Sequence, residues 1–243
     1  MKTSIIIPSF NGYSHLQTCI GLLRKYTETP YEIIVIDNGS QDGTGDFCRK
    51  EKITFVSAGN NLGFVRACNL GMKLASGDSL LLLNNDVAVT RNWLSNMLNC
   101  LYSRDDIGIV GPYTNYASGK QRIDMPYNNL NQLLKLSGLN RSDPDKWMEV
   151  TRLVGFCFLF KRELMNRIGL LDERYSPGHY EDDDYCYRAR LAGYRLMIAG
   201  DVFVHHQGSA SFFKRPKEEV EQLVKTNYTK FLEKWGVDPH IFI

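Results

Sequence analysis

Residues 80–86 read LLLLNND, so that four leucines stand directly before two asparagines and an aspartate. A short apolar run that ends abruptly in polar residues is typical of a strand buried on both faces of a parallel sheet. Such a strand delivers the polar side chains that follow it to one edge of the sheet. The stretch therefore predicts an α/β protein with a polar site at the end of this strand.

The residues before this strand alternate between two patterns. β-branched runs predict strands at 4–7, 32–36 and 54–57, and apolar residues at helical spacing predict helices at 16–26, 42–50 and 64–75. This alternation predicts a parallel sheet, and ligands bind beyond the carboxyl ends of parallel strands. We therefore expect the residues after three strands to share one crevice. They are Pro8, Ser9, Phe10 and Asn11 after the first strand, residues 37–39 after the second, and residues 84–86.

The pattern weakens after residue 112. Residues 113–149 are rich in Asn, Ser, Gly and Asp, and predict a loop-rich insertion with a short helix near 130–136 that faces an acceptor. The elements expected beyond it are an apolar strand at 153–160, a helix at 162–168, an acidic helix from 181 to 192, strands at 195–199 and 202–204, and an amphipathic helix at 218–235 that ends at Gly236.

Composition limits the class of protein. A chain of 243 residues with 43% hydrophobic content buries one full core. The net charge of +2 and the scattered basic residues exclude a nucleic-acid binder. Six widely spaced cysteines without a Cys-x-x-Cys pair are expected to be reduced core residues. The longest nearly apolar stretch is far shorter than the about 20 residues that span a bilayer, and Pro8 interrupts the N-terminal apolar run, so we expect a cytoplasmic protein.

The chemistry that these patterns favour is binding of a divalent cation. Mg²⁺ and Mn²⁺ take oxygen or imidazole ligands and keep positions for substrate phosphates, so one carboxylate and one histidine suffice. Asp86 is the carboxylate, and His205 or His206 supplies the imidazole. Strand alternation sends the two imidazoles to opposite sides, so only one can bind the metal, and a structural role is favoured for His206. A turn or helix cap is the alternative for Asp86.

The run EDDD at 181–184 has two interpretations. Acidic runs usually form solvated helix N-termini, where the helix dipole favours them. In a helix, however, Asp182 shares a face with Cys186, whereas Asp184 pairs at i,i+4 with Arg188. Asp182 is therefore expected to point inward.

A carboxylate held in a cleft can accept a proton from a hydroxyl group as that hydroxyl attacks. Asp182 is the candidate for this general base, and Glu181 competes with it. The chain has no Walker loop and no Gly-x-Gly-x-x-Gly after the first strand, so the sequence does not support an ATPase or a dinucleotide oxidoreductase.

Two further residues have two expectations each. Asp37 is placed to accept hydrogen bonds from a nucleoside base or ribose, or else it caps the turn at 38–40. Arg66 can pair with a diphosphate, or else it is an exposed arginine on a helix.

Six segments, in order along the chain, resemble the motifs of family 2 glycosyltransferases. They are residues 4–11 (SIIIPSFN), 36–40 (IDNGS), 60–64 (NNLGF), 83–86 (LNND), 179–183 (HYEDD) and 205–208 (HHQG). The resemblance runs from about residue 3 to residue 211 and is nearest to the rhamnosyltransferase-like bacterial branch. It implies the GT-A fold, an α/β fold with a Rossmann-like, mostly parallel central sheet flanked by helices.

The resemblance also implies residue roles. Asp182 matches the catalytic base, Asp86 and His205 match the ligands of a Mn²⁺ or Mg²⁺ cofactor, and Asn84 stands where the family's Asp-x-Asp motif has its first Asp. Asp37 matches the residue that reads the nucleotide base. The expected donor-binding set is Pro8, Ser9, Phe10, Asn11, Asp37, Asn38, Gly63, Arg66, Asn84 and Asn85.

The implied activity is inverting transfer of a sugar from a UDP- or dTDP-type donor to a hydroxyl of a glycan, lipid-linked or protein acceptor. We expect one domain with a nucleotide-sugar-binding half (1–112), an acceptor and catalytic half (113–213) and a C-terminal helix (214–243). The alternative is a non-catalytic sugar-nucleotide or glycan-binding module. Peripheral association with the inner face of the membrane, and a homodimer or a larger multidomain assembly, are further expectations.

Overall fold

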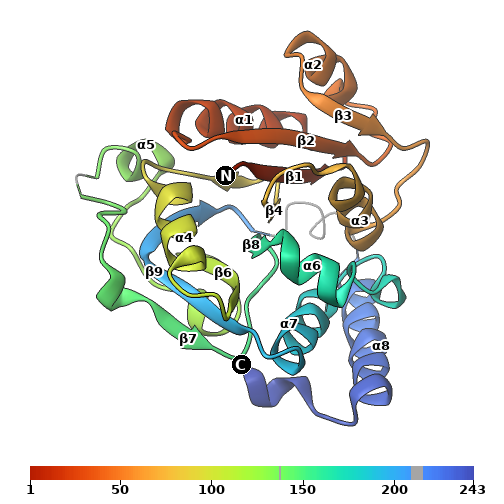
Figure 1. Ribbon diagram of the computed structural model, residues 1–243. Coiled ribbons are helices and arrows are strands. Elements are labelled where there is room, and N and C mark those ends of the chain that lie inside the picture. Colours follow the sequence, from red (N-terminus) through yellow and green to blue (C-terminus); the bar gives the residue numbers. More distant parts are fainter. Residues whose placement is uncertain (137, 209–215) are drawn as a thin grey trace.

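The structure, a computed structural model, describes residues 1–136, 138–208 and 216–243 (Figure 1). The first half alternates strands and helices: β1 (Thr3–Ser9), α1 (Tyr13–Tyr26), β2 (Tyr31–Asp37), α2 (Thr44–Lys50), β3 (Thr54–Ser57), α3 (Phe64–Leu74) and β4 (Ser79–Leu83). Then follow β5 (Val87–Ala88), α4 (Trp93–Tyr102), β6 (Ile107–Thr114), η1 (Gly119–Gln121), α5 (Leu130–Leu133), η2 (Pro144–Lys146) and β7 (Met148–Val150). The last elements are β8 (Cys157–Lys161), α6 (Arg162–Ile168), η3 (Glu173–Tyr175), α7 (Glu181–Leu191), β9 (Arg195–His206), α8 (Lys217–Trp235) and η4 (Pro239–Phe242). The boundary expected between residues 213 and 214 lies outside the described residues.

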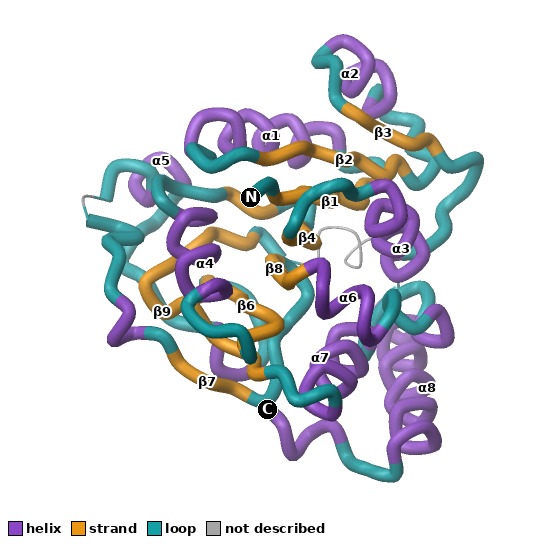
Figure 2. The backbone as a smooth tube through the Cα atoms, viewed as in Figure 1, coloured by secondary structure: helices purple, strands orange, loops and turns teal. Residues whose placement is uncertain are grey.

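The strands of the described residues form one nine-stranded sheet in the order β3-β2-β1-β4-β8-β6-β9-β5, with β7 paired to β9 (Figure 2). The first four strands of this order pair in parallel. Beyond β4 the sheet is mixed, because β8 runs antiparallel to both β4 and β6, while β6 and β9 are parallel. The predicted α/β architecture is confirmed. The run of strands that all pair in parallel comes from the first half of the chain, and β6 with β9 adds one further parallel pair.

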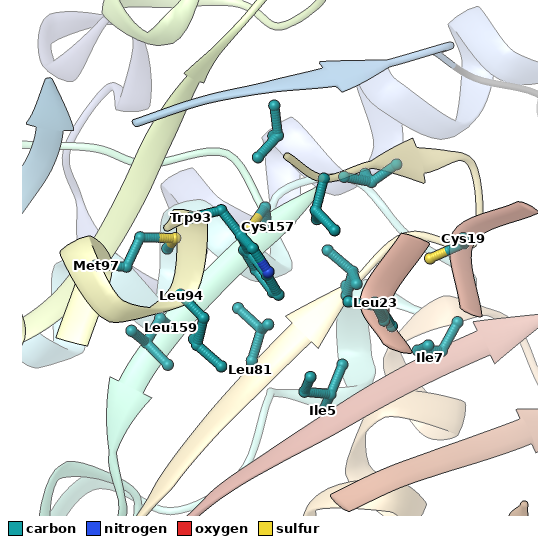
Figure 3. Close-up of a cluster of buried hydrophobic side chains, with 14 of the residues drawn as sticks. Ile5, Ile7, Cys19, Leu23, Leu81, Trp93, Leu94, Met97, Cys157 and Leu159 are labelled. Carbon is teal, nitrogen blue, oxygen red and sulfur yellow. The ribbon is translucent and has the colours of Figure 1, made fainter. Parts of the chain in front are cut away.

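Helices cover both faces of the sheet. One apolar cluster joins the sheet to α1 and α4, and a second joins the other face to α3, α6, α7 and α8. Figure 3 shows the first cluster, in which Trp93 of α4 lies among strand residues such as Leu81 and Leu159. Trp93 is fully buried, and its indole N–H donates to Thr27 Oγ1 at 3.1 Å, so its one polar atom is satisfied.

The elements predicted in the first half are confirmed, with one difference at Pro8. The sequence predicts that the first strand stops at residue 7, but β1 continues through Pro8 to Ser9. The pairing of β1 with β4 ends at Ile6, whereas the pairing with β2 continues to Ser9. Pro8 therefore lies where one side of β1 has no ladder partner, and a residue without an N–H is tolerated there.

Three elements between residues 87 and 114 have no equivalent in the sequence prediction: the short strand β5, and α4 and β6, which are longer. Helix α4 starts after Asn92 in the left-handed conformation, without a side-chain cap and without a charged residue in its first turn. Strand β6 reads IGIVGPYT, and Gly and Pro are poor strand formers. Both elements depend on tertiary packing, because α4 is buried against the sheet and β6 pairs on both sides.

β9 is one strand of 12 residues where the sequence predicts two short strands. Its register against β6 shifts between Ala199, which pairs with Pro112, and Phe203, which pairs with Tyr113. Three residues of β9 thus form a bulge, and this bulge holds the Gly200-Asp201 step that suggested a break. The loop-rich character predicted for 113–149 is confirmed, and its predicted helix is the single turn α5.

We expect Gly71→Ala to destabilise the protein by about 1–3 kcal/mol, the usual cost of overpacking a core. A Cβ at Gly71 of α3 would lie 2.3 Å from Ile6 Cγ2 in β1. Gly21 of α1 is the matched control, because a Cβ there meets nothing within 4 Å. Gly21→Ala should stabilise by about 0.5–1 kcal/mol through helix propensity. Equal stability of the two variants in urea unfolding would contradict the close approach of α3 to β1.

Candidate active site

Polar groups from β1, β2 and β4 meet at one edge of the sheet, as the sequence predicts. Asn85 Nδ2 donates to Ser9 Oγ at 3.0 Å, and the backbone N–H of Asn38 donates to the Ser9 carbonyl at 2.8 Å. All three residues are buried. The carboxyl ends of these strands are therefore joined by direct hydrogen bonds.

Asp37 uses both carboxylate oxygens within this edge. Oδ1 accepts from the Ser40 N–H at 3.0 Å, and Oδ2 accepts from Ser57 Oγ at 3.4 Å. These contacts fit the turn-capping alternative, and recognition of a nucleotide base by Asp37 stays a prediction. The neighbouring Asn38 has a buried Oδ1 without a hydrogen-bond partner in the described part of the chain. A buried acceptor without a partner is unusual, and a bound nucleotide can satisfy it.

The loop after β1 is tied to the loop after β2. Asn11 has φ 46°, its N–H donates to Ser40 Oγ at 2.9 Å, and its Oδ1 accepts from the Gln41 N–H at 2.9 Å. Phe10, just before it, is partly buried. The two loops expected to contact the donor thus form one connected wall.

Gly63 and Arg66, at the start of α3, differ in their relation to this edge. The Gly63 carbonyl accepts from Asn38 Nδ2 at 3.4 Å, which brings the start of α3 to the polar edge. Arg66 Nε instead pairs with Glu173 Oε2 at 3.3 Å, and its side chain is 55% exposed. This is the exposed helix position given as the alternative for Arg66, and diphosphate binding by Arg66 stays a prediction.

Asp86 lies beside His206. His206 Nε2 is 3.4 Å from Asp86 Oδ1 and 3.2 Å from Asn84 Nδ2, and its Nδ1 is 2.9 Å from the Tyr116 carbonyl. Because a carbonyl only accepts, Nδ1 carries a proton. In the neutral ring Nε2 is an acceptor, whereas in the charged ring Nε2 also carries a proton and can donate it to Asp86. Burial alone would raise the pKa of Asp86, but the hydrogen bond and charge of His206 outweigh it and hold this pKa below its ordinary value. Asp86 is therefore an ionised carboxylate next to an imidazole.

The structure places His206 in contact with Asp86, whereas the sequence gives His205 as the metal ligand, and the identity of this ligand stays a prediction. His205 Nδ1 is 2.6 Å from Tyr127 Oη, so its ring points away from Asp86 toward the insertion. Strand alternation separates the two imidazoles, and the pairing of β5 with β9 places His206 opposite Val87. Burial, followed by the charge of His206, lowers the pKa of His205.

The backbone of His206 is held by one side chain. Asn115 Oδ1 accepts from the His206 N–H at 2.9 Å, and Asn115 Nδ2 donates to the His206 carbonyl at 3.0 Å. The ring of Phe156 stacks on the imidazole, with centroids 5.0 Å apart and planes 14° apart. The imidazole is thus fixed in position and orientation.

The acidic run forms the first turn of α7. Glu181, Asp182 and Asp183 line one pocket, and of these three only Asp182 is partly exposed. Asp184 is buried and does not line this pocket. Asp182 Oδ2 accepts from the Gly155 N–H at 2.9 Å, and its Oδ1 accepts from the Asp183 N–H at 3.0 Å. Asp182 is therefore the pocket-lining member of the run that is both partly exposed and oriented by backbone N–H groups.

Glu181 and Asp183 are in different environments. Burial, followed by the charge of Asp182, raises the pKa of Glu181 well above its ordinary value, and Glu181 Oε2 is buried without a hydrogen-bond partner among the described residues. Asp183 pairs with Arg152 Nε at 2.5 Å in a buried ion pair. Burial and Asp182 also raise the pKa of Asp183, against the lowering effect of Arg152.

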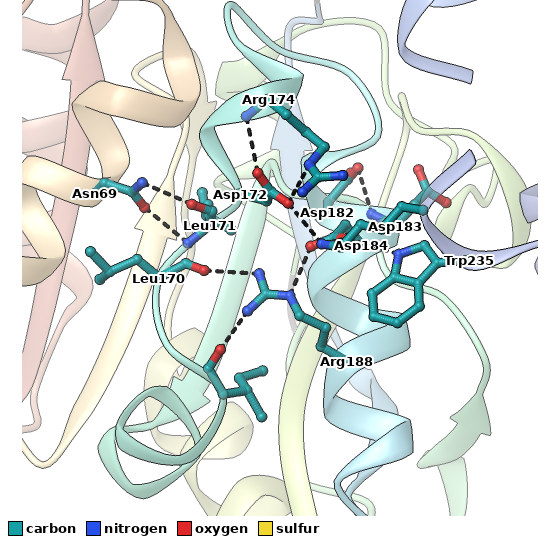
Figure 4. A network of polar contacts seen from close by, with 12 residues as sticks. Asn69, Leu170, Leu171, Asp172, Arg174, Asp182, Asp183, Asp184, Arg188 and Trp235 are labelled. Atoms are coloured by element: carbon teal, nitrogen blue, oxygen red, sulfur yellow. Dashed lines mark hydrogen bonds and ion pairs between the residues drawn. The ribbon is translucent and has the colours of Figure 1, made fainter. Parts of the chain in front are cut away.

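Asp184 anchors α7 to α8 (Figure 4). Its Oδ2 accepts from Arg188 Nε at 2.8 Å, which confirms the predicted i,i+4 pair. Its Oδ1 accepts from Lys234 Nζ at 2.5 Å and from Trp235 Nε1 at 2.9 Å. Arg188 also donates to two backbone carbonyls of the chain after α6. Asp184 is fully buried and accepts three hydrogen bonds, so its role is structural.

One pocket of about 520 Å³ joins these features. One part of its wall comes from the end of β4, β9 and the loop after β6, with Asn84, His206 and Tyr116. Another comes from α7 and the 152–156 segment. The C-terminal residues Pro239 and His240 line it as well. The candidate base therefore shares one cavity with the imidazole that lies beside Asp86.

Sequence reasoning did not find Arg152, Phe156 or Tyr116, all of which line the pocket. Each is a single residue of a common type, and only the folded chain brings it to the site. The sequence predicts an apolar strand at 153–160, and nothing in it indicates that the ring of Phe156 stacks on an imidazole.

The described residues hold no group of three or more His, Cys, Asp or Glu side chains placed to bind a metal ion. Asp86 and His206 would therefore need ligands from a substrate to complete a metal site. Among the helices that the structure describes, none is both long enough and apolar enough to cross a membrane.

The fold and the site define an α/β protein with a polar edge at the carboxyl ends of its parallel strands and with a carboxylate in a pocket next to a histidine–aspartate pair. Comparison with known proteins gives the family. Residues 4–169 match the family described as Glycosyl transferase family 2, and the chain belongs to this family. The resemblance found in the sequence motifs is thus confirmed, while the rhamnosyltransferase-like branch stays a prediction.

Relatives and solved structures agree with this family. The chain is 22% identical over 222 residues to the glycosyltransferase GlyG of Streptococcus pneumoniae, covering 87% of this chain and 72% of GlyG. It is 27% identical over 219 residues to the glycosyltransferase AglE of Haloferax volcanii, covering 84% of this chain and 66% of AglE. The mannosyltransferase PcManGT of Pyrobaculum calidifontis, solved with GDP-Man and Mn²⁺, superposes with a TM-score of 0.66 at 20% identity, covering 86% of this chain and 57% of that one. The fold is therefore that of GT-A glycosyltransferases.

We expect Glu181→Gln to gain stability relative to the wild type as the pH rises above the ordinary glutamate value of 4.5. The folded protein keeps a proton on Glu181 that the unfolded chain releases, so wild-type stability falls with rising pH between the ordinary and the raised pKa. Asp182, Asp183, Arg152 and Cys68 are the ionisable groups that act on Glu181 or are acted on by it. Urea unfolding at about pH 4, 6 and 8 measures the difference.

The control for loss of one charge is Glu233→Gln, an exposed position on α8. A difference between wild type and Glu181→Gln that stays constant over this pH range would show that Glu181 is ionised in the folded protein.

Proposed function

We propose that this protein is an inverting glycosyltransferase that moves a sugar from a nucleoside-diphosphate sugar to a hydroxyl group of an acceptor. The observation that carries the proposal is the shared pocket, in which Asp182 lies on one wall and His206, beside Asp86, on another. A general base and a site for the leaving diphosphate are the two parts that such a displacement needs.

Asp182 would accept the proton of the acceptor hydroxyl as its oxygen attacks C1 of the donor sugar. Two backbone N–H groups orient the carboxylate, and each oxygen keeps lone-pair capacity for the pocket. The attacking oxygen approaches from the side opposite the diphosphate, so the configuration at C1 inverts in a single displacement. No covalent enzyme intermediate is involved.

Asp86 and His206 fit a divalent cation, Mn²⁺ or Mg²⁺, that also binds the donor's phosphates. The fit rests on Nε2 and Oδ1, two acceptor atoms 3.4 Å apart, with the opposite ring nitrogen held by the Tyr116 carbonyl. When bound, such a cation neutralises charge that develops on the departing diphosphate. His205, the ligand expected from the sequence, is replaced by His206 in this proposal.

The polar edge would hold the nucleoside. Ser9, Asp37, Asn38 and Asn85 are joined there, and Asn38 Oδ1 is an acceptor without a partner among the described residues. The binding of GDP-Man and Mn²⁺ by PcManGT, a protein of the same fold, supports a nucleotide-sugar donor for this chain. A UDP- or dTDP-type donor is the choice that the sequence resemblance implies.

The acceptor would enter at the C-terminal side of the pocket. Tyr180, Pro239 and His240 line this side of the pocket that also holds Asp182. The acceptor class proposed is a glycan, a lipid-linked sugar or a protein. Membrane association and oligomeric state stay predictions. The rival proposal, a non-catalytic binding module, does not explain an oriented carboxylate in the pocket.

We expect Asp182→Asn to lower transfer by roughly 10²- to 10⁴-fold, because an amide of the same shape does not accept the acceptor proton. Glu181→Gln should keep turnover near the wild-type value. Release of nucleoside diphosphate from UDP-, dTDP- and GDP-sugars in the presence of Mn²⁺ measures both variants. A fully active Asp182→Asn together with an inactive Glu181→Gln would move the base to Glu181.

We expect Asp86→Ala and His206→Ala each to weaken Mn²⁺-dependent binding of a nucleoside diphosphate by at least about 10-fold, in line with the loss of one metal ligand. His205→Ala is the matched control, because it removes the adjacent imidazole on the other side of β9. Calorimetric titration of UDP with and without Mn²⁺ decides between them. Weakening by His205→Ala alone would restore the original assignment of the ligand.

A further inference from the structure

The segment 152–155, between β7 and β8, runs along the acidic turn of α7. It contacts α7 from positions 152, 153 and 155, and the contacts include one from a side chain and two from backbone N–H groups. They join Arg152 Nε to Asp183 Oδ1 (2.5 Å), Leu153 N to Cys186 Sγ (3.4 Å) and Gly155 N to Asp182 Oδ2 (2.9 Å). The position of this segment therefore determines where the hydrogen bond to Asp182 is made.

Gln121 holds the same segment from the opposite side. Its Oε1 accepts from the Val154 N–H at 2.7 Å, and its Nε2 donates to the Pro112 carbonyl of β6 at 3.0 Å. The side chain is buried, with 2% of the residue exposed. One carboxamide thus links the central sheet to the residue directly before Gly155.

The backbone of β6 leaves room for this carboxamide. A Cβ at Gly111 would lie 2.5 Å from Gln121 Nε2 and 3.1 Å from Leu153 Cδ2. Only glycine at position 111 therefore allows Gln121 to reach both of its partners without a shift. Gly111 lowers the strand propensity of β6, but it allows the Gln121 carboxamide to pack closely against the β6 backbone.

We propose that Gln121 is a positioning residue for Asp182. By fixing the Val154–Gly155 backbone, it holds the Gly155 N–H on Asp182 Oδ2 and so keeps the carboxylate turned toward the pocket. A base has to lie within about 2.6–3.2 Å of the proton it takes, and a displacement of 1 Å can cost about 100-fold in rate. This inference rests on the proposed function, because it concerns the same base.

The 113–149 insertion would then position the base as well as face the acceptor. Gln121 belongs to η1, inside the stretch 113–149 that was expected to face the acceptor. Ser118, in the same stretch, accepts from Arg152 Nη1 at 2.8 Å. The insertion therefore contacts the 152–155 segment at Arg152 and again at Val154. Movement of η1 would shift this segment and so change the geometry of the base.

The test compares Gln121→Met with a matched glutamine. Methionine keeps the volume but removes both hydrogen bonds. Gln132 is the control, because its Oε1 also accepts a backbone N–H, that of Asn128 at 2.8 Å, but on an exposed helix away from α7. We expect Gln121→Met to lower kcat for release of UDP, dTDP or GDP from the sugar nucleotides with Mn²⁺ by about 10- to 100-fold. The KM for the donor should stay within about twofold, and Gln132→Met should match the wild type.

A second variant gives a readout that a purely structural role would not change. In Gln121→Glu, a neutral carboxyl group can accept from the Val154 N–H and donate to the Pro112 carbonyl, as the carboxamide does, whereas the carboxylate cannot donate. The kcat of this variant, divided by that of the wild type at each pH, should therefore rise as the pH falls. A ratio that does not change with pH would overturn the inference. The same holds if Gln121→Met keeps full kcat.

A double-mutant cycle separates this inference from the proposed function. If Gln121 acts through Asp182, adding Gln121→Met to Asp182→Asn should lower the residual rate by no more than about twofold. A full additional loss would show that Gln121 acts elsewhere and would overturn the inference alone. An active Asp182→Asn variant would instead overturn the proposed function. Should Gln121→Met not fold, Gly111→Ala, which displaces the carboxamide, takes its place with the same expectations.

Discussion

Four acidic side chains, at residues 181–184, stand together in the first turn of α7, where their charges would repel one another. Contacts from the second half of the chain stabilise this turn. The helix dipole contributes only about 0.3–1 kcal/mol for each carboxylate near a helix N-terminus, which does not offset burial of several charges. The structure instead gives each carboxylate a different environment. Asp184 has two basic partners from α7 and α8, Asp183 has Arg152, Asp182 has two backbone N–H groups, and Glu181 is buried with a raised pKa.

These four environments separate structure from chemistry within one turn. A fully buried carboxylate that pairs with two cations and an indole N–H anchors the helix and is out of reach of a substrate, as at Asp184. A carboxylate held by two N–H groups at the wall of a pocket keeps acceptor capacity where a hydroxyl can reach it, as at Asp182. Sites that assign different roles to neighbouring carboxylates usually do so through such differences in environment. The surrounding ion pairs thus stabilise the buried members of the acidic run, while Asp182, the proposed base, keeps acceptor capacity at the pocket.

The sequence predicts those parts of the fold that carry a local signal. The alternating strands and helices of residues 3–83 have strong apolar periodicity, and the amphipathic α8 ends at Gly236 as expected. Strand β6 lacks such a signal, because it contains Gly and Pro, and it is stabilised by contacts with distant segments. Helix α4 has apolar residues at helical spacing but no helix-start signal, and it is not among the predicted elements. The polar edge after β1, β2 and β4 follows from the topology of parallel strands. Arg152 and Gln121 reach the acidic turn only through the tertiary fold.

The choice between His205 and His206 shows why some site residues lie beyond sequence reasoning. Alternation along a strand correctly predicts that the two imidazoles separate, but not which of them faces Asp86. That choice depends on register, and β9 carries a bulge of three residues between Ala199 and Phe203. Side chains alternate between the two faces of a sheet, so an odd number of extra residues moves each residue after the bulge to the opposite face relative to its partners on the neighbouring strand. The side of the site that would bind the metal is thus set by a bulge in β9, whereas the carboxylate side is set by ion pairs and backbone N–H groups around α7. Because β6 contacts both β9 and the Gln121 carboxamide, it is the element through which these two sides are held in one geometry.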